Sequence, residues 1–235
     1  MLPQILHGTF RYNANRLFEG HFSLTDLNVI LARITKELPR NLFAVAREEW
    51  DGAYFEASRR AGEVNRYDSP ERREVLGRER HWCSERALRR AGEAAAVSVA
   101  TRDTIPTGGR YALLVSPSFV IGRAKLDRYR GNVKQVKYRR QLATMNAAVS
   151  HLQDDLFLAR MRVRDDRLFG LFLSGVHPKQ PDVPAFLNFA IPNHDLSGWV
   201  FNEPVENVIA AYAEVERPVE RIPDLIRVVL KKPAS

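Results

Sequence analysis

A tract of closely spaced arginines and lysines in the middle of this 235-residue chain is the feature best suited to chemistry. Residues 59–140 hold 20 Lys and Arg against nine Asp and Glu, a net charge of +11, and the rest of the chain carries −3. Clustered cations raise the local potential and release counterions when they meet phosphates. Arginine outnumbers lysine by 29 to 7, and its planar guanidinium can grip a phosphate with two hydrogen bonds. The tract therefore predicts a polyanionic partner.

The densest part of this tract supplies the candidate contacts to phosphate. It covers a predicted basic loop over residues 123–131 and the start of the helix that follows, and three further arginines alternate with apolar residues on one predicted strand. The candidates are Arg123, Lys125, Arg128, Arg130, Lys134, Lys137, Arg139, Arg140, Arg160, Arg162 and Arg164. A GC-rich genome would also enrich Arg over Lys, but it would not concentrate the charge in one third of the chain. We expect a nucleic-acid-associated protein that contacts phosphates through this basic central segment.

Two other functions stay open. A metal-dependent nuclease or other phosphotransfer enzyme would need carboxylates, and a first predicted hairpin carries four of them, Glu48, Glu49, Asp51 and Glu56. Such an enzyme would use Mg²⁺, and otherwise no cofactor is expected. An antitoxin-like or assembly module would instead bind an acidic protein through the basic tract.

Motifs for other chemistry are missing from the sequence. It has no Gly-rich dinucleotide loop, no P-loop and no Gly-x-Ser-x-Gly nucleophile turn. No lysine follows an acidic residue at a distance of two, as in the simple form of a restriction-type nuclease site. Two histidine groups are weaker signals: His151 with Asp154 and Asp155 at helical spacing, and the adjacent pair His194 and Asp195. We assign no catalytic residue and no metal site from the sequence.

Apolar periodicity predicts the elements that must position these residues. Helices are predicted over residues 23–38, 69–92 and 132–153 and from about residue 202. Strands are predicted over 42–46 and 53–57, which would form the first hairpin through Asp51 and Gly52, and over 97–101, 111–116, 119–122 and 185–191, with a second hairpin over 156–174. Because the strands come in adjacent runs, we expect an α+β fold with a largely antiparallel sheet and three to five helices.

Composition limits the class of protein. With 45% hydrophobic and 27% charged residues, the sequence is typical of a globular chain. We expect a single α+β domain over residues 1–235, with a small N-terminal subdomain over 1–66 as an alternative. The lone Cys83 excludes an intramolecular disulfide, and no apolar run is long enough to span a bilayer, so we expect a cytoplasmic protein without a membrane partner.

Aromatic residues near the charges add a second signal for nucleic acid, because unpaired bases stack on aromatic faces. We expect Trp50, Tyr54 and Tyr129 to lie near a surface, and Phe55 and Tyr138 to pack in the core.

Overall fold

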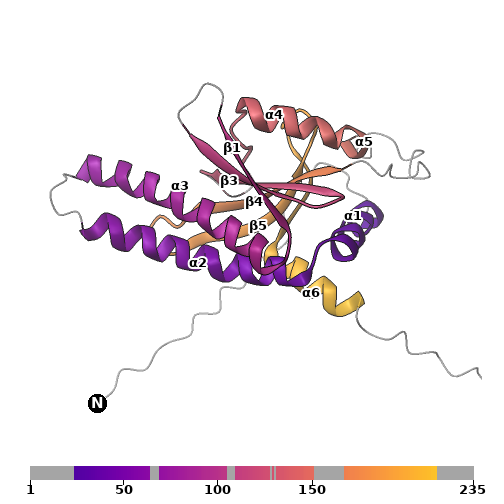
Figure 1. The fold of residues 1–235 in the computed structure, drawn as a ribbon, viewed down its shortest axis with the longest axis horizontal. Helices are drawn as coiled ribbons and strands as arrows, with labels where there is room; N and C mark the ends of the chain where they lie inside the picture. The colour runs from indigo at the N-terminus through magenta and orange to yellow at the C-terminus, as the bar shows by residue number, and fades with distance from the viewer. Residues whose placement is uncertain are drawn as a thin grey trace, which may run out of the picture.

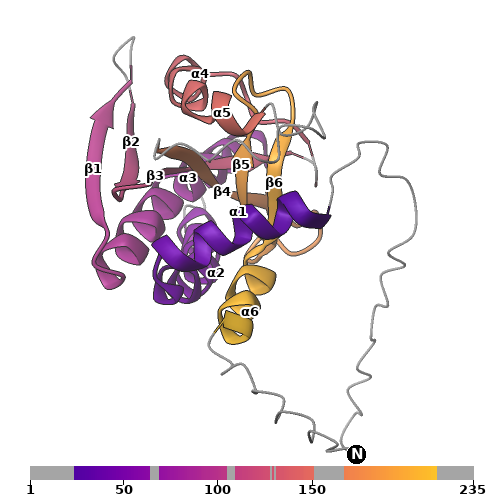
Figure 2. The same ribbon diagram turned by 90° about the vertical axis from the view of Figure 1, so that its right-hand side faces the viewer.

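The structure is a computed structural model that describes residues 24–63, 69–104, 109–127, 129, 131–150 and 167–215. Its sheet lies between two layers of helices (Figure 1, Figure 2). The elements follow one another as α1 (Leu24–Glu37), α2 (Arg40–Glu63), α3 (Ser69–Ala94), β1 (Ser98–Asp103), β2 (Arg110–Val115), β3 (Phe119–Leu126), α4 (Lys137–Ala143), the 3₁₀ turn η1 (Thr144–Asn146), α5 (Ala147–Ser150), β4 (Leu168–Val176), β5 (Pro184–Pro192), β6 (Trp199–Pro204) and α6 (Val205–Val215).

The six strands lie in sequence order, β1 to β6, across one sheet. Every neighbouring pair is antiparallel except β3 and β4, which run parallel. A parallel pair needs a crossover connection, and here the chain leaves β3 and passes through α4, η1 and α5, which run on directly from one another. The predicted α+β fold with a mostly antiparallel sheet is therefore confirmed. None of the described helices is both long and apolar enough to cross a membrane.

Helices cover both faces of the sheet, so the core has two parts. Helices α1, α2, α3 and α6 pack on one face, where they share a cluster with Phe119 and Ile121 of β3. The segment that begins with α4 covers the other face, where Val120 and Ala124 of the same strand belong to a second cluster. Strands covered on both faces read as continuous apolar runs, which explains why eight of the nine residues of β4 are buried.

The predicted first hairpin is wrong, because residues 42–57 belong to the single helix α2. Its buried positions, Leu42, Ala46, Trp50, Tyr54 and Ala57, recur every three or four residues, as on one face of a helix. In this helix Asp51 and Gly52 lie on the exposed side, and a Cβ atom added to Gly52 would meet no atom within 4 Å. A glycine costs about 1 kcal/mol in a helix interior, and the burial of a whole helix face outweighs this cost.

This correction also reverses three of the expectations for aromatic residues. Trp50 and Tyr54, expected near a surface, are 0% and 1% exposed. Phe55, expected in the core, is 60% exposed because it lies on the outer side of α2. Tyr129 is 51% exposed, as expected.

Smaller differences concern the boundaries of other elements. The predicted basic loop over 123–131 is partly strand, since β3 runs to Leu126. The helix predicted over 132–153 begins only at Lys137, and its buried positions are Ala143, Asn146 and Val149, whereas Met145 is 36% exposed. Strand β6 was not predicted. Of the second hairpin, β4 is observed, and residues 156–166 lie outside the described part of the chain.

The C-terminus of α3 sets the direction in which the chain enters β1. The backbone N–H of Ala96 donates to the carbonyl of Glu93, and that of Val97 donates to the carbonyl of Gly92. This pattern is a Schellman cap, in which the residue at the Ala96 position adopts a left-handed conformation. Ala96 has a φ of 54°, a region where a Cβ is unfavourable.

We expect the substitution Ala96→Gly to raise the free energy of unfolding by about 1 kcal/mol, because glycine removes the steric cost of the left-handed conformation. Urea denaturation measures the change. The control Ala94→Gly, inside the last turn of α3, should instead lower stability by about 1 kcal/mol. A destabilised Ala96→Gly protein would contradict this account of the cap.

Candidate functional site

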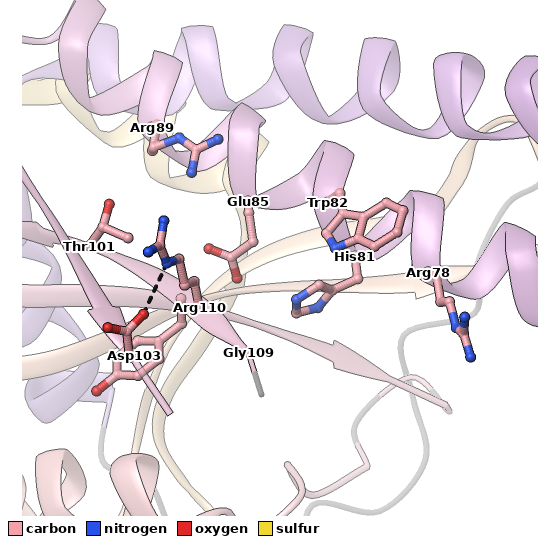
Figure 3. A pocket seen from close by; sticks show the side chains of 10 residues that line it. Arg78, His81, Trp82, Glu85, Arg89, Thr101, Asp103, Gly109 and Arg110 are labelled. Atoms are coloured by element: carbon pink, nitrogen blue, oxygen red, sulfur yellow. Dashed lines mark hydrogen bonds and ion pairs between the residues drawn. The ribbon is translucent and has the colours of Figure 1, made fainter. Parts of the chain in front are cut away.

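An open cavity of about 800 Å³ lies between α3 and the strands β1 and β2. Five residues of α3 line it at spacings of three or four, which places them on one face of the helix: Arg78, His81, Trp82, Glu85 and Arg89. The opposite wall comes from Thr101, Asp103, Gly109, Arg110 and Tyr111. Figure 3 shows the two sets of side chains facing one another across the opening.

Glu85, which lines this cavity, belongs to a buried ion pair with Arg123. The Nε atom of Arg123 lies 2.8 Å from Oε1 of Glu85, and the two side chains are only 9% and 10% exposed. The second carboxylate oxygen, Oε2, accepts a hydrogen bond of 2.6 Å from the backbone N–H of Ala112. Glu85 therefore joins α3 to β2, and Arg123 joins β3 to α3.

Arg123 also determines the protonation of His81. Its Nη2 atom lies 2.6 Å from Nδ1 of His81 and donates to the His81 carbonyl at 2.9 Å. A guanidinium has donors only, so Nδ1 must accept and the ring proton resides on Nε2. Burial, and next the positive charge of Arg123, lower the pKa of His81 below its ordinary value; Arg139 acts in the same direction and Glu85 opposes it. His81 is therefore a neutral ring that offers an N–H donor.

The cations on the walls of the cavity are held weakly. Arg110 contacts Asp103 at 3.0 Å and Arg78 contacts Glu74 at 2.6 Å, with all four side chains more than 60% exposed. Exposed ion pairs of this kind contribute about 0–1 kcal/mol. Arg89 makes no ion pair with any residue in the described part of the chain. These guanidinium groups can therefore accept another anionic partner at little cost.

An aromatic ring lies among these cations. Trp82 is 57% exposed on the cavity wall. On the other wall Tyr111 stacks on Tyr138 of α4, with ring centroids 4.0 Å apart and an interplanar angle of 15°. The stack connects the cavity to the beginning of α4.

Four of the predicted phosphate contacts are exposed in the structure. Lys134, Lys137 and Arg140 lie in and just before α4, and Lys125 lies on β3 with its Nζ atom 3.7 Å from Asp127. Tyr138, between Lys137 and Arg140, stacks on the cavity wall. The start of α4 therefore extends the charged surface of the cavity.

Two other predicted phosphate contacts, Arg123 and Arg139, bind groups of the protein itself. Arg123 belongs to the buried ion pair described above. Arg139 is half-buried, donates to the carbonyls of Lys134 and Arg123, and lies over the ring of Tyr138 at 5.4 Å. Neither guanidinium faces solvent freely, so both support the site from inside. The remaining candidates lie outside the described residues: Arg128, Arg130, Arg160, Arg162 and Arg164.

The acidic residues of the nuclease alternative lie on α2, and several are held by arginines. Glu49 contacts Arg90 at 3.4 Å. Hydrogen bonds from Arg59 and then Arg60 lower the pKa of Glu56 to about 2. Within the ranges described, no three His, Cys, Asp or Glu side chains gather closely enough to hold a metal ion.

Of the two histidine groups, the structure describes only the pair His194 and Asp195. In the pair His194 and Asp195, the aspartate accepts a hydrogen bond of 2.9 Å from the backbone N–H of Ser197 and so closes a local turn. The group His151, Asp154 and Asp155 lies outside the described residues.

Sequence reasoning missed the residues that form the cavity itself. The available signal was the polar stripe on α3, in which Arg78, Glu85 and Arg89 recur at helical spacing around Trp82. A second signal was the alternation along β3, which puts residue 123 on the same side as the buried Phe119 and Ile121. Together they predict that Arg123 points inward beneath α3.

Comparison of the chain with protein-family models, with curated proteins and with solved structures finds no match.

We expect Arg123→Met to lower the free energy of unfolding by about 3–5 kcal/mol, because it leaves the Glu85 carboxylate buried without its cation. The double variant with Glu85→Met should lose less than the sum of the two single variants, and its remaining loss should include the unpaired N–H of Ala112. Urea denaturation of the wild type, the two single variants and the double variant gives the coupling free energy between Arg123 and Glu85.

The exposed pair of Arg78 and Glu74 provides the matched control for this cycle. Because both side chains are about 65% exposed, Arg78→Met should change stability by less than about 1 kcal/mol. Strictly additive effects of the substitutions at residues 85 and 123 would refute the interpretation of the buried pair.

The lowered pKa of His81 predicts a loss of stability in mild acid. The unfolded chain protonates this ring near its ordinary pKa of about 6.5, at a higher pH than the folded protein does, so stability falls as the pH drops below that value. We expect the fall in unfolding free energy between about pH 7 and pH 5 to be smaller in His81→Gln, whose amide oxygen can still accept from Arg123. An equal fall in both proteins would show that folding does not disfavour the imidazolium.

Proposed function

We propose that this protein binds nucleic acid through contacts to phosphates. The surface in question, called the basic face here, consists of the cavity arginines and the exposed cations around α4: Arg78, Arg89, Arg110, Lys125, Lys134, Lys137 and Arg140. The observation that carries the proposal is the cavity between α3 and the β1–β2 strands, which is lined by an exposed tryptophan and by three arginines with weak partners, or none among the described residues.

The charge balance of the cavity favours an anion. Its carboxylates are Glu85 and Asp103, and Glu85 is already neutralised by Arg123 beneath it. Asp103 neutralises Arg110 only through an exposed contact. A phosphate group offers each arginine a fully charged acceptor with matching geometry, which is a stronger partner than an exposed carboxylate.

The position of α4 supports a ligand longer than the cavity. The stacked pair Tyr111 and Tyr138 and the hydrogen bond from Arg139 to the Arg123 carbonyl hold the start of α4 against the cavity. Lys134, Lys137 and Arg140 then extend the positive charge along a second element. A polymer with regularly spaced phosphates can contact both parts at once, and each contact adds to the affinity by releasing counterions.

We expect the triple variant Lys134→Ala, Lys137→Ala, Arg140→Ala to bind a DNA duplex more weakly and with a smaller dependence on salt. The slope of log affinity against log salt should fall by roughly 0.9 for each phosphate that the variant no longer neutralises. Fluorescence anisotropy at several salt concentrations between about 50 and 200 mM measures the slope, with EDTA present to prevent turnover.

A control variant with the same change of net charge tests whether position matters. Lys36, Arg40 and Arg47 lie on α1 and α2, on the opposite side of the sheet from α4 (Figure 2). Their replacement by alanine should leave the slope unchanged. An equal slope in all three proteins would defeat the assignment of the basic face, and loss of intact strands only when Mg²⁺ replaces EDTA would favour the nuclease alternative.

A further inference from the structure

Trp82 is the feature of the cavity that phosphate binding alone does not explain. Its indole is 57% exposed on the wall of a cavity that three arginines also line. Large aromatic side chains contribute most when their faces are covered, and a phosphate backbone does not offer a flat apolar surface. An unstacked nucleotide base does, and stacking on tryptophan tolerates any base.

The size of the cavity limits what can cover this ring. A volume of about 800 Å³ lies in the range of small-molecule pockets, which is about 300–1,000 Å³. Such a space can hold one nucleotide but not a double helix. In a duplex the base faces are stacked on one another and only the edges are accessible, so the ligand of Trp82 must contain an unpaired base.

The polar groups that line the cavity specify a ligand rich in acceptors. His81 presents Nε2–H, since Arg123 occupies Nδ1. Both oxygens of Glu85 are engaged, by Arg123 and by the N–H of Ala112. Arg89 and Arg110 add donors from opposite walls. The donors that remain fit phosphate oxygens and base carbonyls, which are the acceptors of a nucleotide.

We infer that the cavity holds one unpaired nucleotide of a single-stranded segment, with its base stacked on Trp82 and its phosphate between Arg89 and Arg110. This inference rests on the proposed function and narrows it to single-stranded DNA or RNA. The rest of the strand follows the cations around α4. An acidic peptide would satisfy the arginines but would leave the face of Trp82 uncovered.

The test compares a single-stranded oligonucleotide with a duplex of the same sequence, using the full chain. Trp82→Ala should weaken single-strand binding by roughly 5- to 100-fold, the range of one base stack, and should leave duplex binding unchanged. Trp82→Phe should retain most of the affinity, and Arg89→Ala with Arg110→Ala should weaken single-strand binding independently. Phe55→Ala, an exposed aromatic residue on α2, is the matched control and should have no effect.

Tryptophan fluorescence provides a second readout that does not depend on affinity. Single-strand binding should quench the emission of the wild type, and Trp82→Phe should abolish the quenching, because Trp50 is fully buried and Trp199 does not line the cavity. Circular dichroism confirms that each variant is folded.

The possible failures of the two proposals can be told apart. If the wild type binds neither oligonucleotide, both proposals fall. If it binds both equally, and Trp82→Ala changes neither affinity nor quenching, the inference about the cavity falls while phosphate binding stands. Tighter binding of a poly-glutamate peptide than of the oligonucleotide, weakened by Arg89→Ala with Arg110→Ala, would make the cavity a site for an acidic protein and would also overturn the inference.

Discussion

The buried ion pair between Arg123 and Glu85 is the contact on which the rest of the candidate site depends. Removing two charges from water costs several kcal/mol for each ion, and their attraction returns about that amount, so the net contribution of the pair to stability is small. The main effect of the pair is to fix the position of α3 against the sheet. Because Glu85 contacts Ala112 of β2 and Arg123 of β3, the pair favours one rotation of α3 about its axis, together with the buried apolar side chains of the same helix. That rotation turns Trp82 toward the opening and holds His81 against Arg123.

How much of the fold could be predicted depended on whether local pattern and tertiary burial agreed. The helix at α1 and the run β1 to β3 were predicted from their apolar periods, although β3 runs four residues beyond its predicted end. In α2 the local sequence and the pattern of burial disagree. Asp51 and Gly52 favour a turn, while the spacing of Leu42, Ala46 and Trp50 fits a helix. Trp50 packs on Phe172 of β4, with ring centroids 5.3 Å apart, and a contact across more than a hundred residues is not visible in a local pattern. Packing therefore decided the helix.

The candidate site was predictable in its region but not in its details. Net charge identifies a stretch of sequence in which cations concentrate, because charge adds up along the sequence whatever the fold. Net charge does not show which arginines face inward. Arg123 and Arg139 stand among the most basic residues of the chain, yet both donate to carbonyls of the protein itself. Arg89, which is not among the predicted phosphate contacts, lines the cavity. The placement of α3 across the sheet determines which arginines bind the protein itself, as Arg123 and Arg139 do, and which line the cavity, as Arg89 does.

The two sides of α3 differ in how their charges are balanced, and this difference gives the molecule a basic face. Toward α2, cations and carboxylates alternate across the helix pair: Arg90 contacts Glu49 at 3.4 Å, and Arg60 lies 3.5 Å from Glu79. Toward the β1–β2 strands the carboxylate that α3 contributes to the cavity, Glu85, is neutralised by the buried Arg123. Two of the arginines on that side, Arg78 and Arg110, are opposed only by the exposed carboxylates of Glu74 and Asp103. A net charge spread evenly over 82 residues would favour no face of the molecule, whereas this partition leaves excess positive charge on the side of α3 that also exposes Trp82.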